Sequence, residues 1–203
     1  MALRTLEPNA SVTQRIATEV RGMARRPGVK SLAIGGAADG SLGVAAPHPV
    51  FNLGLDSLES PDWMNLVKMT GWRYFVTSDV GVVAAAEAVT ASDGGHVEGT
   101  MTNEGPFVIG TETALVLAEA DPTVAKGSFA LGLLRIPALY VVALWLRGEK
   151  KSEGTDWFVP VAPAPEPLVA GVLTRPGDFI KALIRLKALK ATATVRERAS
   201  PSN

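Results

Sequence analysis

The sequence predicts an α+β fold, with one curved antiparallel sheet of about five to six strands and helices packed on one face. Three observations predict it. Short runs of alternating or β-branched residues are separated by turn residues, and helical segments stand before, between and after these runs. With 47% hydrophobic residues, the chain of 203 residues has enough apolar side chains for one sizeable core. We expect an N-terminal extension at residues 1–12, a single domain at 13–190, and a disordered polar tail at 191–203.

Four segments show helical spacing or the residues that begin and end helices. The first, residues 13–26, ends at a Pro-Gly pair, and the second, residues 60–71, begins with Ser-Pro-Asp and ends at glycine. The third, residues 111–120, has Thr111 as its expected N-cap and stops before a proline. The last begins at Gly177 and turns large apolar side chains toward a core.

Alternation or β-branched content marks six strand segments: residues 50–56, 72–77, 80–90, 96–102, 138–147 and 155–161. Tight turns join the second, third and fourth of these, which predicts an antiparallel meander. A charged loop, residues 148–154, joins the last two as a hairpin. His48 stands between two prolines, and we expect it in a surface loop.

Charge is arranged in blocks along a chain whose formal net charge is zero. Residues 1–30 hold six bases and two acids, residues 31–127 three bases and twelve acids, and residues 175–203 seven bases and two acids. The basic ends either lie across an acidic face of their own domain or meet the acidic middle of a partner. For a partner, the candidate interface residues are Trp157, Arg21, Lys181 and Arg185.

Candidate chemistry gathers around the second of two histidines. His96 and Glu98 share one face of a predicted strand, and Asp93 lies in the adjoining turn. Such a group is able to bind a divalent metal or to form a base with its orienting acid. Glu98 would also face Glu87 across the hairpin, if the register allows, and two adjacent carboxylates raise one pKa or attract a cation.

Several function classes lack their signatures in this sequence. It has no cysteine, no phosphate-binding glycine motif and no G-x-S-x-G nucleophile motif. The most apolar stretch, residues 129–146, is interrupted by Arg135 and Pro137, whereas a membrane-spanning helix needs about 20 apolar residues. The first 30 residues have no apolar run of a secretory signal. We therefore expect a cytoplasmic protein without a membrane span.

The sequence favours a non-catalytic, cytoplasmic protein–protein binding or assembly module whose partner is another protein or copies of itself. We expect no nucleic acid, cofactor or metal as a partner, because the net charge is zero and no binding motif is present. The alternative is a small-ligand-binding or hydrolase-like α+β domain, with a cupped sheet that uses Asp93, His96 and Glu98.

Overall fold

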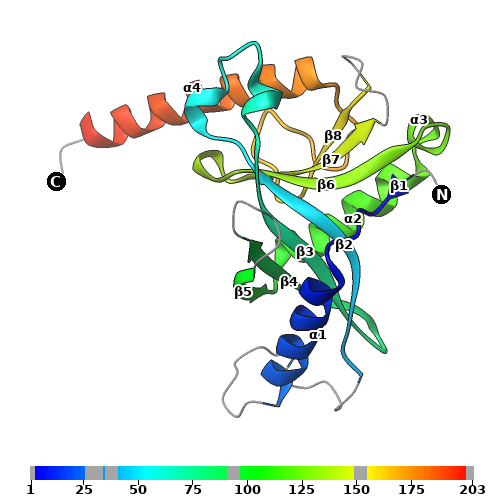
Figure 1. Ribbon diagram of the computed structural model, residues 1–203. Coiled ribbons are helices and arrows are strands. Elements are labelled where there is room, and N and C mark those ends of the chain that lie inside the picture. Colours follow the sequence, from blue (N-terminus) through cyan, green and yellow to red (C-terminus); the bar gives the residue numbers. More distant parts are fainter. Residues whose placement is uncertain (1–2, 26–33, 35–40, 91–96, 149–154, 200–203) are drawn as a thin grey trace.

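The computed structural model describes residues 3–25, 34, 41–90, 97–148 and 155–199 (Figure 1). This part of the chain is an α+β fold built on one open, mostly antiparallel sheet of eight strands. The α+β class is confirmed, and the predicted strand count is too low. The strands are β1 (Leu3–Arg4), β2 (Gly43–Asn52), β3 (Lys68–Ser78), β4 (Gly81–Thr90), β5 (Val97–Asn103), β6 (Phe129–Ile136), β7 (Val141–Gly148) and β8 (Trp157–Pro160). The helices are α1 (Ala10–Ala24), α2 (Pro106–Ala120), α3 (Pro122–Ala125) and α4 (Pro176–Ala199), with 3-10 turns η1 (Leu55–Ser57), η2 (Trp63–Leu66) and η3 (Pro137–Leu139).

Two antiparallel meanders make up the sheet, one from β2 to β5 and one from β6 to β8. Parallel pairing of β2 with β6 joins them in the order β5-β4-β3-β2-β6-β7-β8, and β1 is a second parallel neighbour of β6. The meander predicted over residues 72–102 is confirmed by the pairing of β3, β4 and β5. The segment between β5 and β6 holds α2 and α3, which gives the chain the length to return parallel to β2.

Helices cover both faces of the sheet, which corrects the prediction that they pack on one face. Successive side chains of a strand point to opposite faces, so neighbouring residues of β6 decide the question. Leu133 belongs to the core that includes Ala114 of α2, whereas Leu134 belongs to the core that includes Phe179 of α4. Both leucines are fully buried, so β6 is covered on both faces, and its residues up to Leu134 form an apolar run rather than an alternating one.

Helix α1 covers the part of the sheet formed by β3 and β4. Ile16 packs in the same core as Trp72 and Tyr74, which alternate with Arg73 along β3. The helix therefore lies on the face opposite to the Arg73 side chain. The side chain of Asn9 caps the helix by accepting a hydrogen bond from the Ser11 backbone amide, so α1 begins before the predicted residue 13.

Residues 60–71 do not form the predicted α-helix. They hold the short turn η2, and β3 already begins at Lys68. Gly71, interpreted from sequence as the end of a helix, lies inside β3. A Cβ atom there would stand 2.0 Å from the carbonyl oxygen of Ala88. The glycine therefore permits a close approach of the neighbouring strand instead of ending a helix.

The apolar stretch of residues 129–146 holds two strands rather than the single strand predicted within it. β6 ends at Ile136, η3 makes the turn, and β7 begins at Val141. Tyr140 takes the left-handed conformation at this turn, with φ 56°, a position that glycine or asparagine usually occupies. The absence of such a turn residue concealed β6 in the sequence.

Both terminal segments contribute to regular structure. Leu3 of β1 is buried and pairs with Phe129 of β6, although the sequence suggests only an extension at residues 1–12. Helix α4 continues to Ala199, well past residue 191, where the sequence predicts a disordered tail. The alanines and long basic side chains of this segment are good helix formers, which accounts for the continuation.

Candidate functional site

The predicted group of Asp93, His96 and Glu98 lies largely outside the described residues. Only the backbone of Glu98, in β5, is described. The suggested pairing of Glu98 with Glu87 is wrong, because the register places Met101 opposite Glu87. A shift between Val89 and Thr90 changes the register near the hairpin, which sequence alternation alone does not reveal.

His48 occupies a central strand rather than the predicted surface loop. It lies in β2 beside a register shift between Ala45 and His48, and such bulges tolerate the prolines on either side. The ring is fully buried, and its Nδ1 donates a hydrogen bond of 2.8 Å to the carbonyl oxygen of Ala46. Burial lowers the pKa of His48 to about 4, so the ring is neutral at pH 7.

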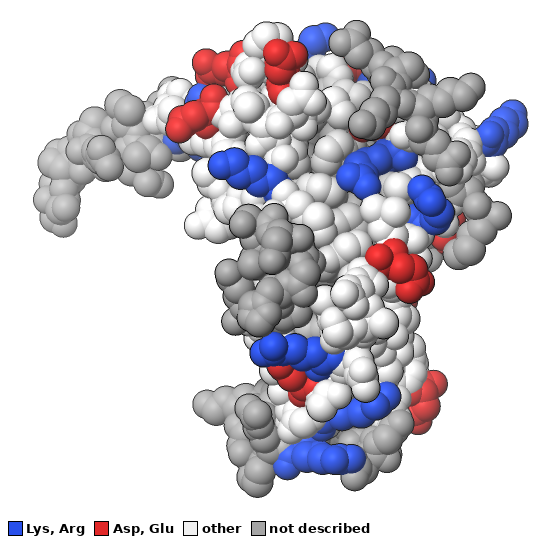
Figure 2. Space-filling model, viewed as in Figure 1, with Lys and Arg blue, Asp and Glu red and all other residues white. Residues whose placement is uncertain are grey.

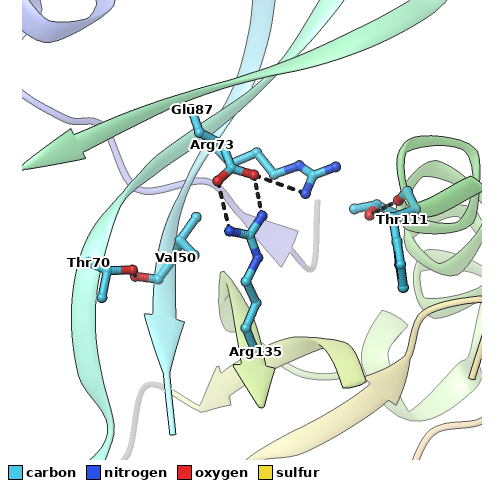
Figure 3. A network of polar contacts seen from close by, with 7 residues as sticks. Val50, Thr70, Arg73, Glu87, Thr111 and Arg135 are labelled. Carbon is cyan, nitrogen blue, oxygen red and sulfur yellow. Dashed lines mark hydrogen bonds and ion pairs between the residues drawn. The ribbon is translucent and has the colours of Figure 1, made fainter. Parts of the chain in front are cut away.

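Figure 3 shows a buried cluster of charged side chains on one face of the sheet. His48 points to the same face, because it is the register partner of Arg73, a member of this cluster. Arg73 of β3 donates from Nη1 to Oε1 of Glu87 on β4, over 3.1 Å. Arg135 of β6 donates from Nη1 to Oε2 of Glu87 over 2.8 Å, and from Nη2 to Oε1. We call Arg73, Glu87 and Arg135 the ion cluster. Arg135 therefore holds the Glu87 carboxylate with two parallel contacts, the strongest geometry for such a pair.

The ion cluster connects the two meanders of the sheet. β4 and β6 are separated by β3 and β2, which is about 14 Å along a flat sheet at the usual strand spacing. The long side chains of Arg135 and Glu87 cross this span. Both carboxylate oxygens are occupied by guanidinium groups, and Glu87 is only 4% exposed. These contacts indicate a structural role for the cluster, because guanidinium groups engage both oxygens of a buried carboxylate.

Sequence reasoning missed the ion cluster, although the sequence carries a signal for it. Arg73, Glu87 and Arg135 each stand alone as a charge within an apolar stretch: Trp72 to Val76, Ala84 to Val89 and Leu131 to Ile136. Buried charges occur in pairs, so three isolated charges in three apolar stretches indicate a buried partnership. The pairing itself could not be predicted, because β4 and β6 are not neighbours in the sheet.

The candidate interface residues do not come together in the structure. Arg21 lies on α1, where its Nε donates to the carbonyl oxygen of Leu42, whereas Lys181 and Arg185 are exposed on α4. Figure 2 shows bases at the α1 end and again near α4, with acids among them. Trp157 is half-buried, with the guanidinium of Arg175 3.6 Å from its ring centre. The basic ends of the chain therefore form two separate surfaces.

An apolar surface follows the outer side of α2. The helix begins at Pro106, and Thr111 is inside it rather than at its N-cap, with its hydroxyl donating to the carbonyl oxygen of Phe107. Ile109, Val116 and Leu117 are exposed at 66%, 61% and 49%. Together with Thr113 they lie at helical spacing on one side, and we call these four residues the α2 surface.

A pocket of about 410 Å³ opens beside the α2 surface. Ile109, Thr113 and Leu117 line it from the helix, and Pro163 and Ala170 line it from the segment after β8. The helix and the segment approach so closely at Gly110 that a Cβ atom there would stand 2.1 Å from the carbonyl oxygen of Ala162. The pocket wall is almost entirely apolar, with the hydroxyl of Thr113 as its one side-chain hydrogen-bonding group.

The chain was compared with protein-family models, curated proteins and solved structures, and no match was found. Within the described residues, no three histidine or acidic side chains lie close enough to hold a metal ion together. None of the helices in the described ranges has the length and apolar content to cross a membrane.

Proposed function

We propose that this protein is a protein–protein binding module and that the α2 surface, with its pocket, is the binding site. The observation that supports it is the continuity of exposed apolar side chains with an apolar pocket. Scattered exposed apolar residues are ordinary on protein surfaces, whereas apolar side chains gathered around a hollow are typical of binding sites. Val169 and Val172, exposed at 62% and 50%, extend the apolar area beyond the pocket.

Charge around the pocket favours one kind of partner. Residues 104–125 hold four acids and no lysine or arginine, and residues 160–174 hold Glu166 and no base. Glu119 and Glu166 are exposed, and Glu112 is partly so. An apolar stripe with acidic flanks is complementary to an amphipathic helix with basic flanks. The pocket accommodates a few apolar side chains of such a helix rather than the helix itself.

The scaffold holds the α2 surface in place. Ala114 and Ala118, on the inner side of α2, are buried against the sheet in the core that includes Leu133 and Leu144. The 162–171 segment supports the other side of the helix through the close approach at Gly110. A site on a packed helix binds without ordering a loop, which reduces the entropy cost of association.

A photo-crosslinking experiment tests this function. A benzophenone amino acid replaces Thr113 in the full chain, and the matched control carries it at exposed Asp79 in the turn between β3 and β4. On irradiation in cells, we expect discrete protein adducts from position 113 that disappear when Ile109→Asp is added. Adducts of equal pattern from position 79, or no adduct from position 113, would contradict the proposal.

A further inference from the structure

We propose that the partner of the α2 surface is helix α4 of a second copy of this chain, an inference that rests on the proposed function. Three features of α4 support it: its charge, an exposed apolar stripe, and its extension beyond the body of the molecule. The three are independent of one another, and each corresponds to a property of the α2 surface.

The charge of α4 is complementary to that of the α2 surface. The helix carries six bases and two acids, whereas α2 and residues 160–174 carry acids without bases. Lys181 and Arg185 are exposed on α4, and the pair of Lys181 with Asp178 over 3.6 Å is itself solvent-exposed. Glu112 and Glu119 lie beside the apolar residues of α2 at helical spacing. Two α2 surfaces facing each other would instead bring acids together.

α4 has two faces, and among the described residues only one of them packs against the core of its own molecule. Phe179, Leu183 and Leu186 are buried in the core beneath the helix. On the opposite side Ile184, Ala188 and Ala191 follow at i, i+4 and i+7, and all three are exposed. The small side chains of the two alanines allow another helix to approach closely. This stripe therefore suits a second helix with larger apolar residues, which α2 provides.

The end of α4 extends away from the rest of the molecule (Figure 1). Lys190 still contacts the body, where its Nζ donates to the carbonyl oxygen of Leu139 over 3.0 Å. The helix then continues to Ala199, and residues 191–193 are exposed. The exposed stripe from Ile184 to Ala191 spans about 10 Å, close to the roughly 12 Å from Ile109 to Leu117 on α2.

The same molecule cannot bring these two helices together. α2 and α4 pack on opposite faces of the sheet, as Leu133 and Leu134 of β6 show. Covering the α2 surface with α4 therefore requires a second copy. Because the two surfaces differ, the contact is either exchanged reciprocally in a closed dimer or repeated head to tail.

Charge reversal with complementation tests the inference. One variant carries Lys181→Glu and Arg185→Glu, and the other carries Glu112→Lys and Glu119→Lys. We expect the purified wild-type chain to self-associate in sedimentation velocity, and each variant alone to associate about tenfold more weakly. An equimolar mixture of the two variants should restore association, because each α4 then meets an α2 of opposite charge. Lys68→Glu combined with Asp79→Lys, on exposed residues of β3 and of the turn after it, is the matched control and should associate like wild type.

Two results would overturn the inference. The first is a wild-type chain that stays monomeric at every concentration while position 113 still crosslinks to a different protein, an outcome that leaves the proposed function intact. The second is self-association that Leu117→Asp abolishes but that the charge-reversed variants retain, which would indicate a contact between two α2 helices. Equal thermal unfolding midpoints for all variants confirm that only surface properties have changed.

Discussion

The ion cluster and the α2 surface depart in opposite directions from the usual placement of side chains. At the ion cluster, charged groups are buried, and Arg73 is only 1% exposed. At the α2 surface, large apolar groups are in water, and Ile109 is 66% exposed. The buried charges find their partners inside the molecule, since Arg73 and Arg135 both bind Glu87. Within the described residues the apolar groups of α2 remain exposed, and under our proposal another molecule covers them.

This comparison separates a stabilising region from a binding region. Removing one partner of a buried ion pair leaves an uncompensated charge in the interior, which is costly. Replacing an exposed apolar side chain changes little in the free energy of unfolding. Substitutions in the two regions should therefore differ in which property they affect, stability in the first and association in the second.

The largest effect is expected at the centre of the ion cluster. Glu87→Gln leaves two buried or part-buried guanidinium groups without an anion, and should lower the free energy of unfolding by about 3–5 kcal/mol. Urea denaturation measures this difference. Glu119→Gln removes the same charge from an exposed position of α2 and should change stability by less than about 0.5 kcal/mol. Equal effects of the two substitutions would contradict a stabilising role of the cluster.

A smaller loss is expected on acidification, because His48 is buried in its neutral form. Its pKa is about 4 in the folded chain and 6.5 in the unfolded chain. The unfolded state therefore binds the extra proton between these values, and stability from this group falls as pH decreases from 6.5 to 4. Between pH 7.5 and 5 the loss amounts to roughly 2 kcal/mol.

Denaturant unfolding of wild type and His48→Gln at both pH values isolates this contribution. The substituted side chain does not titrate, so its pH-dependent loss of stability should be smaller by that amount. An identical pH dependence in the two proteins would show that His48 is not buried as a neutral ring.

The support of α2 by the 162–171 segment should be sensitive to one methyl group. Gly110→Ala places a Cβ atom against the Ala162 carbonyl, so the helix or the segment must move. This movement should lower the free energy of unfolding by about 1 kcal/mol. Gly177→Ala is the control in α4, where a Cβ atom would meet no atom within 4 Å. Thermal unfolding of both variants measures the difference. A stabilised Gly110→Ala protein would mean that the close approach does not exist.

The smallest effect on stability is expected at the α2 surface itself. Leu117→Gln replaces a half-exposed side chain and should change the free energy of unfolding by less than about 0.5 kcal/mol. Val108→Ala, at a buried position of the same helix, should cost more. Chemical denaturation measures the free energy of unfolding of both variants and so distinguishes the exposed side of α2 from its buried side. A large loss from Leu117→Gln would place this side chain in the core instead of at a binding surface.

The sequence predicts the elements whose signals are local. The meander of β3 to β5 follows from alternation and turn residues, α1 and α4 follow from helical spacing, and α2 follows from its composition and stop signal. Prediction from sequence fails where the role of a residue depends on a contact with a distant part of the chain. Gly71 ends no helix because it lies against Ala88, and the prolines around His48 mark a bulge in β2 instead of a loop.

The sites depend even more on contacts between distant parts of the chain. The ion cluster needs the parallel pairing of β2 with β6 to bring Arg135 within reach of Glu87, and no local pattern specifies that pairing. The α2 surface is visible in the sequence only as a helix with apolar residues on every side. Which side faces the sheet is decided by the packing of Ala114 and Ala118. The charge blocks, in contrast, can be counted directly from the sequence. Their complementarity is one of the arguments for the proposed contact between copies.

Disulfide crosslinking between copies tests the central claim, that α4 of one molecule covers α2 of another, most directly. The chain has no cysteine, so single introduced cysteines react only with each other. One variant carries Thr113→Cys on α2, and the other carries Ala188→Cys on the exposed stripe of α4. On mild oxidation, a mixture of the two should form a disulfide-linked heterodimer in larger yield than either variant forms with itself. Heterodimer yields no higher than the yields of the separate homodimers would contradict the claim.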